Sequence, residues 1–241
     1  MLIELGRAAC DVPYLASVVL GAGRSGLRSG RPRSRRGGRP RRDRARWCSP
    51  RRWPSEDGDD PRVPSARAER ADGQWVLTGV KTAVDAAPEA DLFLVPCASP
   101  DGVLVFLVAP SDAGVRVEPQ QLTDFGSAGR VVLDGCVVSG DRVLGGADAV
   151  ADWLVARATV GLCAMQSGVI ERALELTAEY AKSRVAFGRP IGSFQAVTQR
   201  LADAFVDVEA VRLTMWQAAW LLLPGSAAAA EVATAKFWAA E

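Results

Sequence analysis

Histidine is absent from this chain of 241 residues, and no two of its cysteines form a Cys-x-x-Cys pair. The five cysteines are scattered along the sequence, at Cys10, Cys48, Cys97, Cys136 and Cys163. This composition argues against a zinc site, a histidine-activated nucleophile and a disulfide framework. We therefore expect any chemistry to depend on carboxylates or on a bound cofactor.

Long apolar runs are missing as well. The longest, at residues 103–109 and 216–223, fall short of the roughly 20 residues that cross a bilayer, so we expect no membrane span. Residues 1–23 lack a basic leader and place charged residues among the apolar ones, which does not fit a secretory signal. The sequence thus predicts a cytoplasmic protein without a metal centre.

Acidic residues are almost absent from one short segment. Residues 24–52 carry thirteen arginines and a single acid, Asp43, whereas the rest of the chain has 16 basic and 27 acidic residues, a net charge of −11. Residues 24–54 show neither helical nor strand periodicity and consist largely of Arg, Gly, Pro and Ser. We expect this segment to be disordered or the product of a shifted reading frame.

From residue 74 the pattern becomes that of short strands. Turn pairs such as Asp72-Gly73, Ala113-Gly114 and Asp134-Gly135 separate the runs. Five β-branched or aromatic runs begin at Trp75, Asp91, Gly102, Val115 and Arg130. This spacing predicts an antiparallel β-domain, a small barrel or sandwich of five or six strands, over residues 55–146.

After residue 146 strand signals give way to helical ones. We expect helices at residues 149–183 and 194–223, the second ended by Pro224-Gly225, and a third from about Ala227. The second helix carries an apolar stripe at steps of three and four, made by Val197, Leu201, Ala204, Val208, Val211, Met215, Ala218 and Leu222. The fold class is therefore α+β, with a helical bundle at residues 147–241.

The junction between the two long helices carries the most specific motif. From Tyr180 to Ala196 the chain reads Tyr-Ala-Lys-Ser-Arg-Val-Ala-Phe-Gly-Arg-Pro-Ile-Gly-Ser-Phe-Gln-Ala. This resembles the signature of acyl-CoA dehydrogenases: Tyr, three residues, Arg, two residues, Phe-Gly, then Pro-Ile-Gly, any residue, Phe-Gln. Residues 75–81 and 131–146 also resemble this family, and residues 1–23 are similar to part of its N-terminal helical domain.

The resemblance implies a flavin cofactor and the residues that contact it. In the family, the matching Arg, Phe and Gln contact the FAD of a neighbouring subunit, which assigns this role to Arg184, Phe187 and Gln195. A guanidinium suits a pyrophosphate because its planar fork donates two charge-assisted hydrogen bonds. The alternative is that Phe187 and Phe194 only fill the helix junction while Arg184 is a solvated charge. Gln199, one turn further on, is interpreted as structural.

Two departures from the family pattern bear on catalysis. The family has a strand that commonly reads Lys, any residue, Trp, Ile or Val, then Thr or Ser, and the corresponding residues here are Lys81-Thr82-Ala83-Val84-Asp85. The family's Thr-Glu-Pro loop is matched only weakly, at residues 55–61. The catalytic base is missing too. One family branch places a Glu where this chain has Ala158, and the other places it beyond residue 241, while Glu241 fits a helix surface.

Three functions are compatible with this pattern. The first is an FAD-dependent acyl-CoA dehydrogenase that is truncated or disrupted in this chain. Such an enzyme is an oligomer that oxidises the Cα–Cβ bond of an acyl-CoA and passes electrons to an acceptor protein. The second is a non-catalytic subunit that completes a partner's FAD site in a heteromer. The third, nucleic-acid binding by the arginine segment, is disfavoured because no aromatic or lysine-rich element accompanies it and the remainder is acidic.

The arginine-rich segment yields a test at the gene level. Because family-like residues stop at Gly23 and resume near Ser55, we predict that residues 24–54 are read out of frame. Resequencing the locus should show a shifted frame that encodes a helix followed by Thr-Glu-Pro. A shifted frame that encodes nothing of this kind would make the hypothesis wrong.

Overall fold

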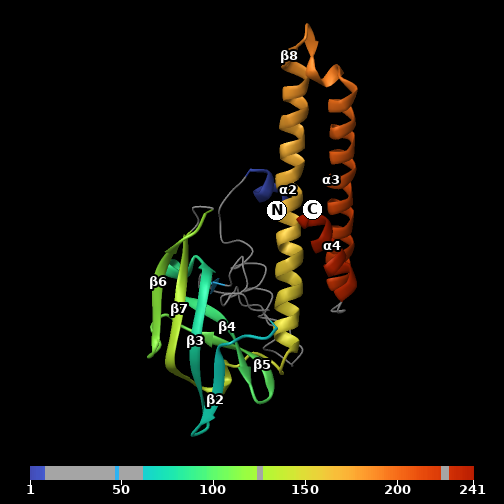
Figure 1. The fold of residues 1–241 in the computed structure, drawn as a ribbon. Coiled ribbons are helices and arrows are strands. Elements are labelled where there is room, and N and C mark those ends of the chain that lie inside the picture. Colours follow the sequence, from blue (N-terminus) through green and yellow to red (C-terminus); the bar gives the residue numbers. More distant parts are fainter. Residues whose placement is uncertain (9–46, 49–61, 124–126, 224–227) are drawn as a thin grey trace, which may run out of the picture. The chain divides into compact units, whose positions relative to one another are not determined.

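The structure is a computed structural model that describes residues 1–8, 47–48, 62–123, 127–223 and 228–241. Its contacts divide the chain into two compact units. One unit combines the N-terminal helix with Thr159–Glu241, and the other ends at Ala158. The division falls inside one long helix, and each unit is described by itself below (Figure 1).

The sheet lies in the second unit. Its strands are β1 (Trp47–Cys48), β2 (Arg67–Ala71), β3 (Gln74–Asp85), β4 (Leu92–Ser99), β5 (Gly102–Val108), β6 (Val115–Gln121) and β7 (Ser127–Val138). They are hydrogen-bonded in the order β1-β4-β2-β3-β7-β6, with β5 on β4. The five predicted strand runs are thus confirmed, as is the turn at Asp72-Gly73, where both residues have positive φ.

Among the described strands, the predicted β-domain of an α+β fold is confirmed and four of the six pairings in the sheet are antiparallel, but the sheet departs from a wholly antiparallel domain or barrel. The sheet is mixed, because β1 and β2 both pair with β4 in parallel, and it does not close into a barrel, since β6 pairs only with β7. Strand β2 was not predicted because its side chains are mostly charged and exposed. Strand β1 lies in the range expected to be disordered, and the rest of residues 9–61 is outside the described part.

The core of the sheet is built from alternate residues of facing strands. Trp75 on β3 meets Phe106 on β5 edge to face, with ring centroids 5.5 Å apart, and both are buried. Asp134-Gly135, predicted as a turn, lies instead inside β7. Gly135 has a φ of 65° there, and the register with β3 shifts between Leu133 and Cys136, which is the geometry of a β-bulge.

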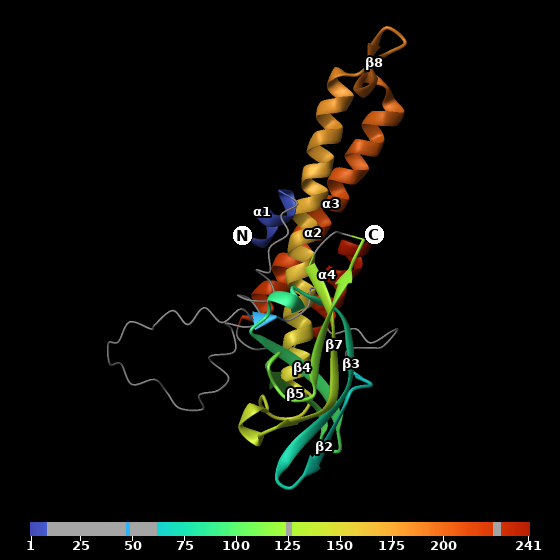
Figure 2. The same cartoon turned by 90° about the vertical axis from the view of Figure 1, so that its left-hand side faces the viewer.

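The predicted helices are confirmed. They are α2 (Ala149–Ser183), α3 (Gln195–Leu222) and α4 (Ala229–Ala240), and α2 and α3 lie side by side in both views (Figures 1 and 2). The short helices η3 (Ala87–Glu89) and η4 (Gly140–Arg142) belong to the loops of the sheet unit. The apolar stripe of α3 is buried from Val208 to Leu222 but only partly buried at its first three positions. Pro224-Gly225 lies outside the described residues.

Helix α2 begins against the sheet through its first turn. The Asp148 carboxylate accepts a hydrogen bond from the Val103 backbone N–H at 2.8 Å, and the Val103 carbonyl accepts one from the Asp148 N–H at 2.9 Å. Among the described helices, α2 alone is long and apolar enough to span a membrane, yet buried core helices meet the same criterion and 44% of its most apolar window is buried. The absence of a membrane span stays a prediction.

The N-terminal helix α1 (Leu2–Arg7) packs against α2 with almost no space between the backbones. A Cβ on Gly6 would lie 2.0 Å from the Met165 carbonyl oxygen, and a Cβ on Gly168 would lie 1.9 Å from that of Ile3. The Arg7 guanidinium then forms ion pairs of 2.9 Å with Glu171 and 2.8 Å with Glu175. Its hydrogen bonds lower the pKa of Glu175.

This close approach predicts a selective effect of one methyl group. Gly168→Ala favours the α2 helix itself, because alanine is the better helix former, but its Cβ collides with Ile3. We expect α1 to detach, so that hydrogen exchange at residues 2–7 rises to the rate of a free peptide while the helical circular dichroism signal is kept.

Gly140→Ala is the matched control, because a Cβ at Gly140 would meet no atom within 4 Å. Unchanged exchange at residues 2–7 in Gly168→Ala would contradict the packing of α1 described here.

Candidate functional site

The turn between α2 and α3 is a small β-hairpin. Strands β8 (Val185–Ala186) and β9 (Arg189–Pro190) pair, and η5 (Ile191–Ser193) leads into α3. The two residues of the loop, Phe187 and Gly188, have φ of 52° and 79°. Positive φ at both positions is what a two-residue hairpin turn requires. Gly188 adopts it without strain, whereas Phe187 is a non-glycine residue in a sparsely populated region.

Backbone contacts hold this hairpin at the end of the helix pair. The Arg184 N–H donates to the Tyr180 carbonyl at 2.8 Å, and the Arg184 carbonyl accepts from the Ile191 N–H at 2.8 Å. Gly192 allows the chain to pass close to α2. A Cβ there would lie 3.0 Å from the Ala181 carbonyl oxygen of α2.

The three predicted site residues meet at this end of the helices. Arg184 follows α2, Phe187 lies in the loop, and Gln195 is the first residue of α3. The side chains of Arg184 and Gln195 are exposed, and neither forms a hydrogen bond or ion pair with another described residue. The site therefore presents a guanidinium and an amide that are available to a ligand.

Phe187 does not fill the helix junction, so that alternative is wrong for its ring, which is 97% exposed. It touches the rest of the protein edge to face at Phe194, with centroids 6.2 Å apart. The Arg189 guanidinium lies over the other ring at 4.2 Å and fixes Phe194 from a second side. An exposed aromatic ring held in strained backbone is typical of a contact surface.

The strand segment that departs from the family pattern lies in the other unit. Lys81 and Asp85 are both buried on β3. Between them the register with β7 shifts, and Ala83 has a φ of 51° while its N–H donates to Gln120 Oε1 at 2.8 Å. Ala86 also has positive φ. The segment thus bends away from a regular ladder where the family places an aromatic residue and a hydroxyl.

No catalytic base is found at the position tested by sequence. Ala158 is 5% exposed, so the side chain there is small, apolar and buried. Burial raises the pKa of Cys136 and of Cys163, which keeps both thiols protonated and inert. Within the described ranges, no group of three His, Cys, Asp or Glu side chains could hold a metal ion.

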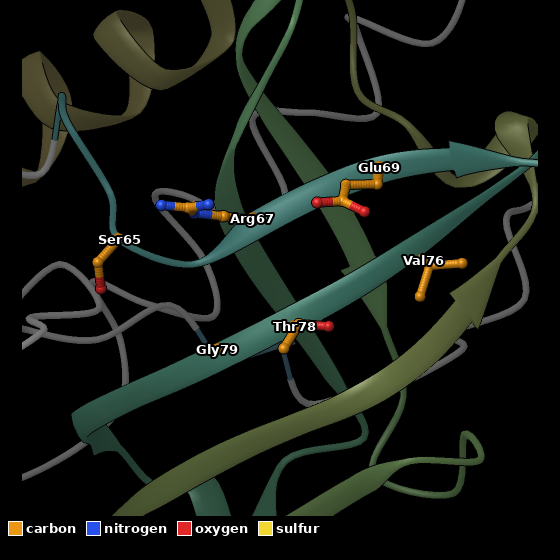
Figure 3. Close-up of a pocket in the computed structure, with 6 residues that line it drawn as sticks. All are labelled: Ser65, Arg67, Glu69, Val76, Thr78 and Gly79. Atoms are coloured by element: carbon orange, nitrogen blue, oxygen red, sulfur yellow. The ribbon is translucent and has the colours of Figure 1, made fainter.

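A hollow of about 340 Å³ opens on the outer face of the β2–β3 hairpin (Figure 3). Its lining is Ser65, Arg67, Glu69, Val76, Thr78 and Gly79. None of the predicted site residues lines it. The signal that could have located it is the alternation of exposed Arg67 and Glu69 with buried Ala66 and Ala68.

Comparison with protein families identifies the domains in which the hairpin and the bent strand lie. The acyl-CoA dehydrogenase middle domain matches residues 54–136, and the acyl-CoA dehydrogenase C-terminal domain matches residues 146–241. The chain belongs to the acyl-CoA dehydrogenase family. In an acyl-CoA dehydrogenase chain, the hairpin that carries Arg184 and Phe187 therefore lies in the C-terminal domain, and the bent β3 strand lies in the middle domain.

Relatives of the chain bear acyl-CoA dehydrogenase and related names. Acyl-CoA dehydrogenase FadE27 of Mycobacterium tuberculosis is 44% identical over all of this chain and 65% of its own length. An L-prolyl-[peptidyl-carrier protein] dehydrogenase of Pseudomonas fluorescens is 34% identical over 76% of this chain and 51% of its own length. The chain thus spans less than two thirds of either relative.

Two solved structures share the fold over 98% of this chain and 63% of theirs. The ChsE4-ChsE5 complex from Mycobacterium tuberculosis superposes with a TM-score of 0.81 at 40% identity. The Tcur3481-Tcur3483 steroid ACAD G363A variant superposes with a TM-score of 0.83 at 30% identity.

Proposed function

We propose that this chain takes part in FAD-dependent α,β-dehydrogenation of an acyl-CoA thioester, within an oligomer and in lipid metabolism. The observation that carries the proposal is the outward hairpin with Arg184, Phe187 and Gln195 at the end of α2 and α3. We also propose that the protein is cytoplasmic and that it passes its electrons to an acceptor protein.

The residues of the hairpin fit an FAD molecule. Arg184 offers a planar donor fork for the pyrophosphate, Gln195 offers an amide, and Phe187 offers a ring face held outside the core. All three lie at the exposed end of the helix pair, which suits a flavin bound by a neighbouring subunit. When bound, FAD supplies the acceptor for the hydride from the substrate's β-carbon.

A second candidate function is that of a subunit that completes a partner's flavin site without performing the proton abstraction. Removal of the α-proton needs a carboxylate with a pKa near neutrality. This chain has buried Ala158 at one family position, and buried Asp85 replaces the hydroxyl of the family strand. The solved ChsE4-ChsE5 complex, in which two different chains assemble, supports this heteromeric form.

The role of the hairpin in flavin binding can be measured directly. Arg184→Ala or Gln195→Ala should weaken FAD retention in the assembled protein, because loss of a charge-assisted contact costs on the order of 1.5–3 kcal/mol, about tenfold to a hundredfold in affinity. Flavin absorbance after dilution and filtration gives the occupancy.

Arg200→Ala is the control, because it removes an exposed arginine of α3 outside the hairpin. Equal flavin occupancy in Arg184→Ala, Arg200→Ala and the unaltered protein would rule out the assigned contact.

We predict that the chain alone, with FAD added, does not dehydrogenate acyl-CoA at an appreciable rate. A positioned carboxylate contributes about 10²–10⁴ in rate, and Ala158 cannot supply one. Coexpression with a partner subunit that contributes the base should restore turnover with an artificial electron acceptor. The substrate panel includes straight-chain and steroid-derived thioesters, since one similar structure is a steroid ACAD.

Robust turnover by the unaccompanied chain would contradict the need for a partner's base. Asp85→Asn would then be the next variant to assay, because Asp85 is a buried carboxylate on the family's flavin-facing strand.

A further inference from the structure

Three side chains form a stack at the hairpin between α2 and α3. The Arg189 guanidinium lies 4.2 Å from the centroid of the Phe194 ring. The Phe194 ring in turn meets the Phe187 ring edge to face, with centroids 6.2 Å apart. Phe194 is therefore the middle member, in contact with a cation and with a second aromatic ring.

The contact with Phe194 is what places the Arg189 side chain. Arg189 is exposed, and its guanidinium forms no hydrogen bond or ion pair with another described residue. A long charged side chain without partners would sample many rotamers, so its position over the ring is held by the attraction between the cation and the ring face. The backbone brings it there, because Arg189 pairs with Ala186 and closes the two-residue loop.

The backbone of Phe194 connects the stack to the other residues of the hairpin site. Its carbonyl accepts the Thr198 N–H at 3.0 Å, a hydrogen bond of the first turn of α3, and its own N–H donates to the Ile191 carbonyl at 3.1 Å. The Ile191 N–H donates to the Arg184 carbonyl at 2.8 Å. Phe194 thus directly precedes Gln195 and is two backbone hydrogen bonds away from Arg184.

Phe187 depends on this support more than an ordinary loop residue does. Its ring is 97% exposed, and its φ of 52° lies in a region that is costly for a non-glycine residue. Among the described residues, Phe194 is the one whose ring it contacts. Whatever loosens the Phe194 ring therefore releases the Phe187 ring as well.

We propose that Arg189 is a positioning residue of the flavin site, which acts through Phe194 to hold the Phe187 ring in the orientation that a flavin nucleotide contacts. This inference rests on the proposed function and adds to it a residue that acts without touching the ligand. The physical basis is preorganisation. A ring that is already ordered does not have to be ordered when the ligand binds, so less binding free energy is lost.

Fluorine NMR tests the stack in the full chain without flavin. 4-Fluorophenylalanine placed at position 187 gives one signal, whose chemical shift should differ from that of the free amino acid because the Phe194 ring lies beside it. Arg189→Gln should move this signal toward the free value, and Arg189→Lys, which keeps a cation, should restore most of the difference. Arg200→Gln is the matched control, since it neutralises an exposed arginine of α3 outside the hairpin. A signal that Arg189→Gln leaves unchanged would overturn the proposal.

Titration of FAD into the assembled protein measures the consequence for binding. Arg189→Gln should weaken FAD binding about twofold to fivefold, the fold-change that corresponds to an exposed cation–π contact. Phe194→Leu keeps the charge of Arg189 but removes the ring, so it should weaken binding by at least this factor. The double variant should then lose little more than Phe194→Leu alone, because both changes break one stack. Weaker FAD binding in Arg189→Gln with unchanged binding in Phe194→Leu would mean that the charge acts on the ligand directly, and would overturn the positioning role.

Arg184→Ala separates this inference from the proposed function, because Arg184 is not part of the stack and its replacement should leave the fluorine signal in place. Weaker FAD binding in Arg184→Ala but not in Arg189→Gln would overturn the positioning role and leave flavin binding by the hairpin intact. FAD binding that neither substitution changes would contradict the proposed function, and the positioning role with it.

Discussion

The reversal of the chain at Phe187-Gly188 is the constraint on which the helical unit depends. Two consecutive residues with positive φ turn the backbone within a two-residue loop, and Pro190 prevents α2 and α3 from merging into one helix. The reversal sets α3 antiparallel to α2, which buries Val208 and Met215 in the helical unit. It also leaves the ring of Phe187 and the guanidinium of Arg184 at the exposed end, where a ligand can reach them.

The parts of the fold that local pattern controls were predicted well from sequence. Helices α2 and α3 have long apolar periodicity and clear end signals, so their bounds agree with the structure to within about one residue. Strand β2 was not predicted, because Arg67, Glu69 and Arg70 are exposed charged residues on one short strand. The parallel pairing of β2 with β4 was not predicted for another reason. It joins segments about thirty residues apart, and the local sequence pattern of a strand does not indicate which distant strand it pairs with.

For the candidate site, the sequence identified the residues but not their exposure or burial. The spacing of Arg184, Phe187 and Gln195 was readable from sequence because a turn between two helices fixes it. The 97% exposure of Phe187 could not be predicted from sequence, because an aromatic residue in a Gly-rich turn is compatible with a buried position. Only the structure shows that this turn projects into solvent. Ala158 and Asp85 were likewise recognised from sequence as departures from the family pattern, but only the structure shows that both are buried.

The glycine contact between α1 and α2 has a consequence for the order of synthesis. Residues 2–7 are synthesised about 160 residues before the Gly168 surface that receives them, a delay of roughly 10–30 s at elongation rates of about 5–20 residues per second. A six-residue helix has no stability of its own in water. During this interval the apolar side chains of Leu2 and Ile3 have no docking site on α2. Docking of α1 therefore waits until the part of α2 around Gly168 has been made, although α1 precedes it in the sequence.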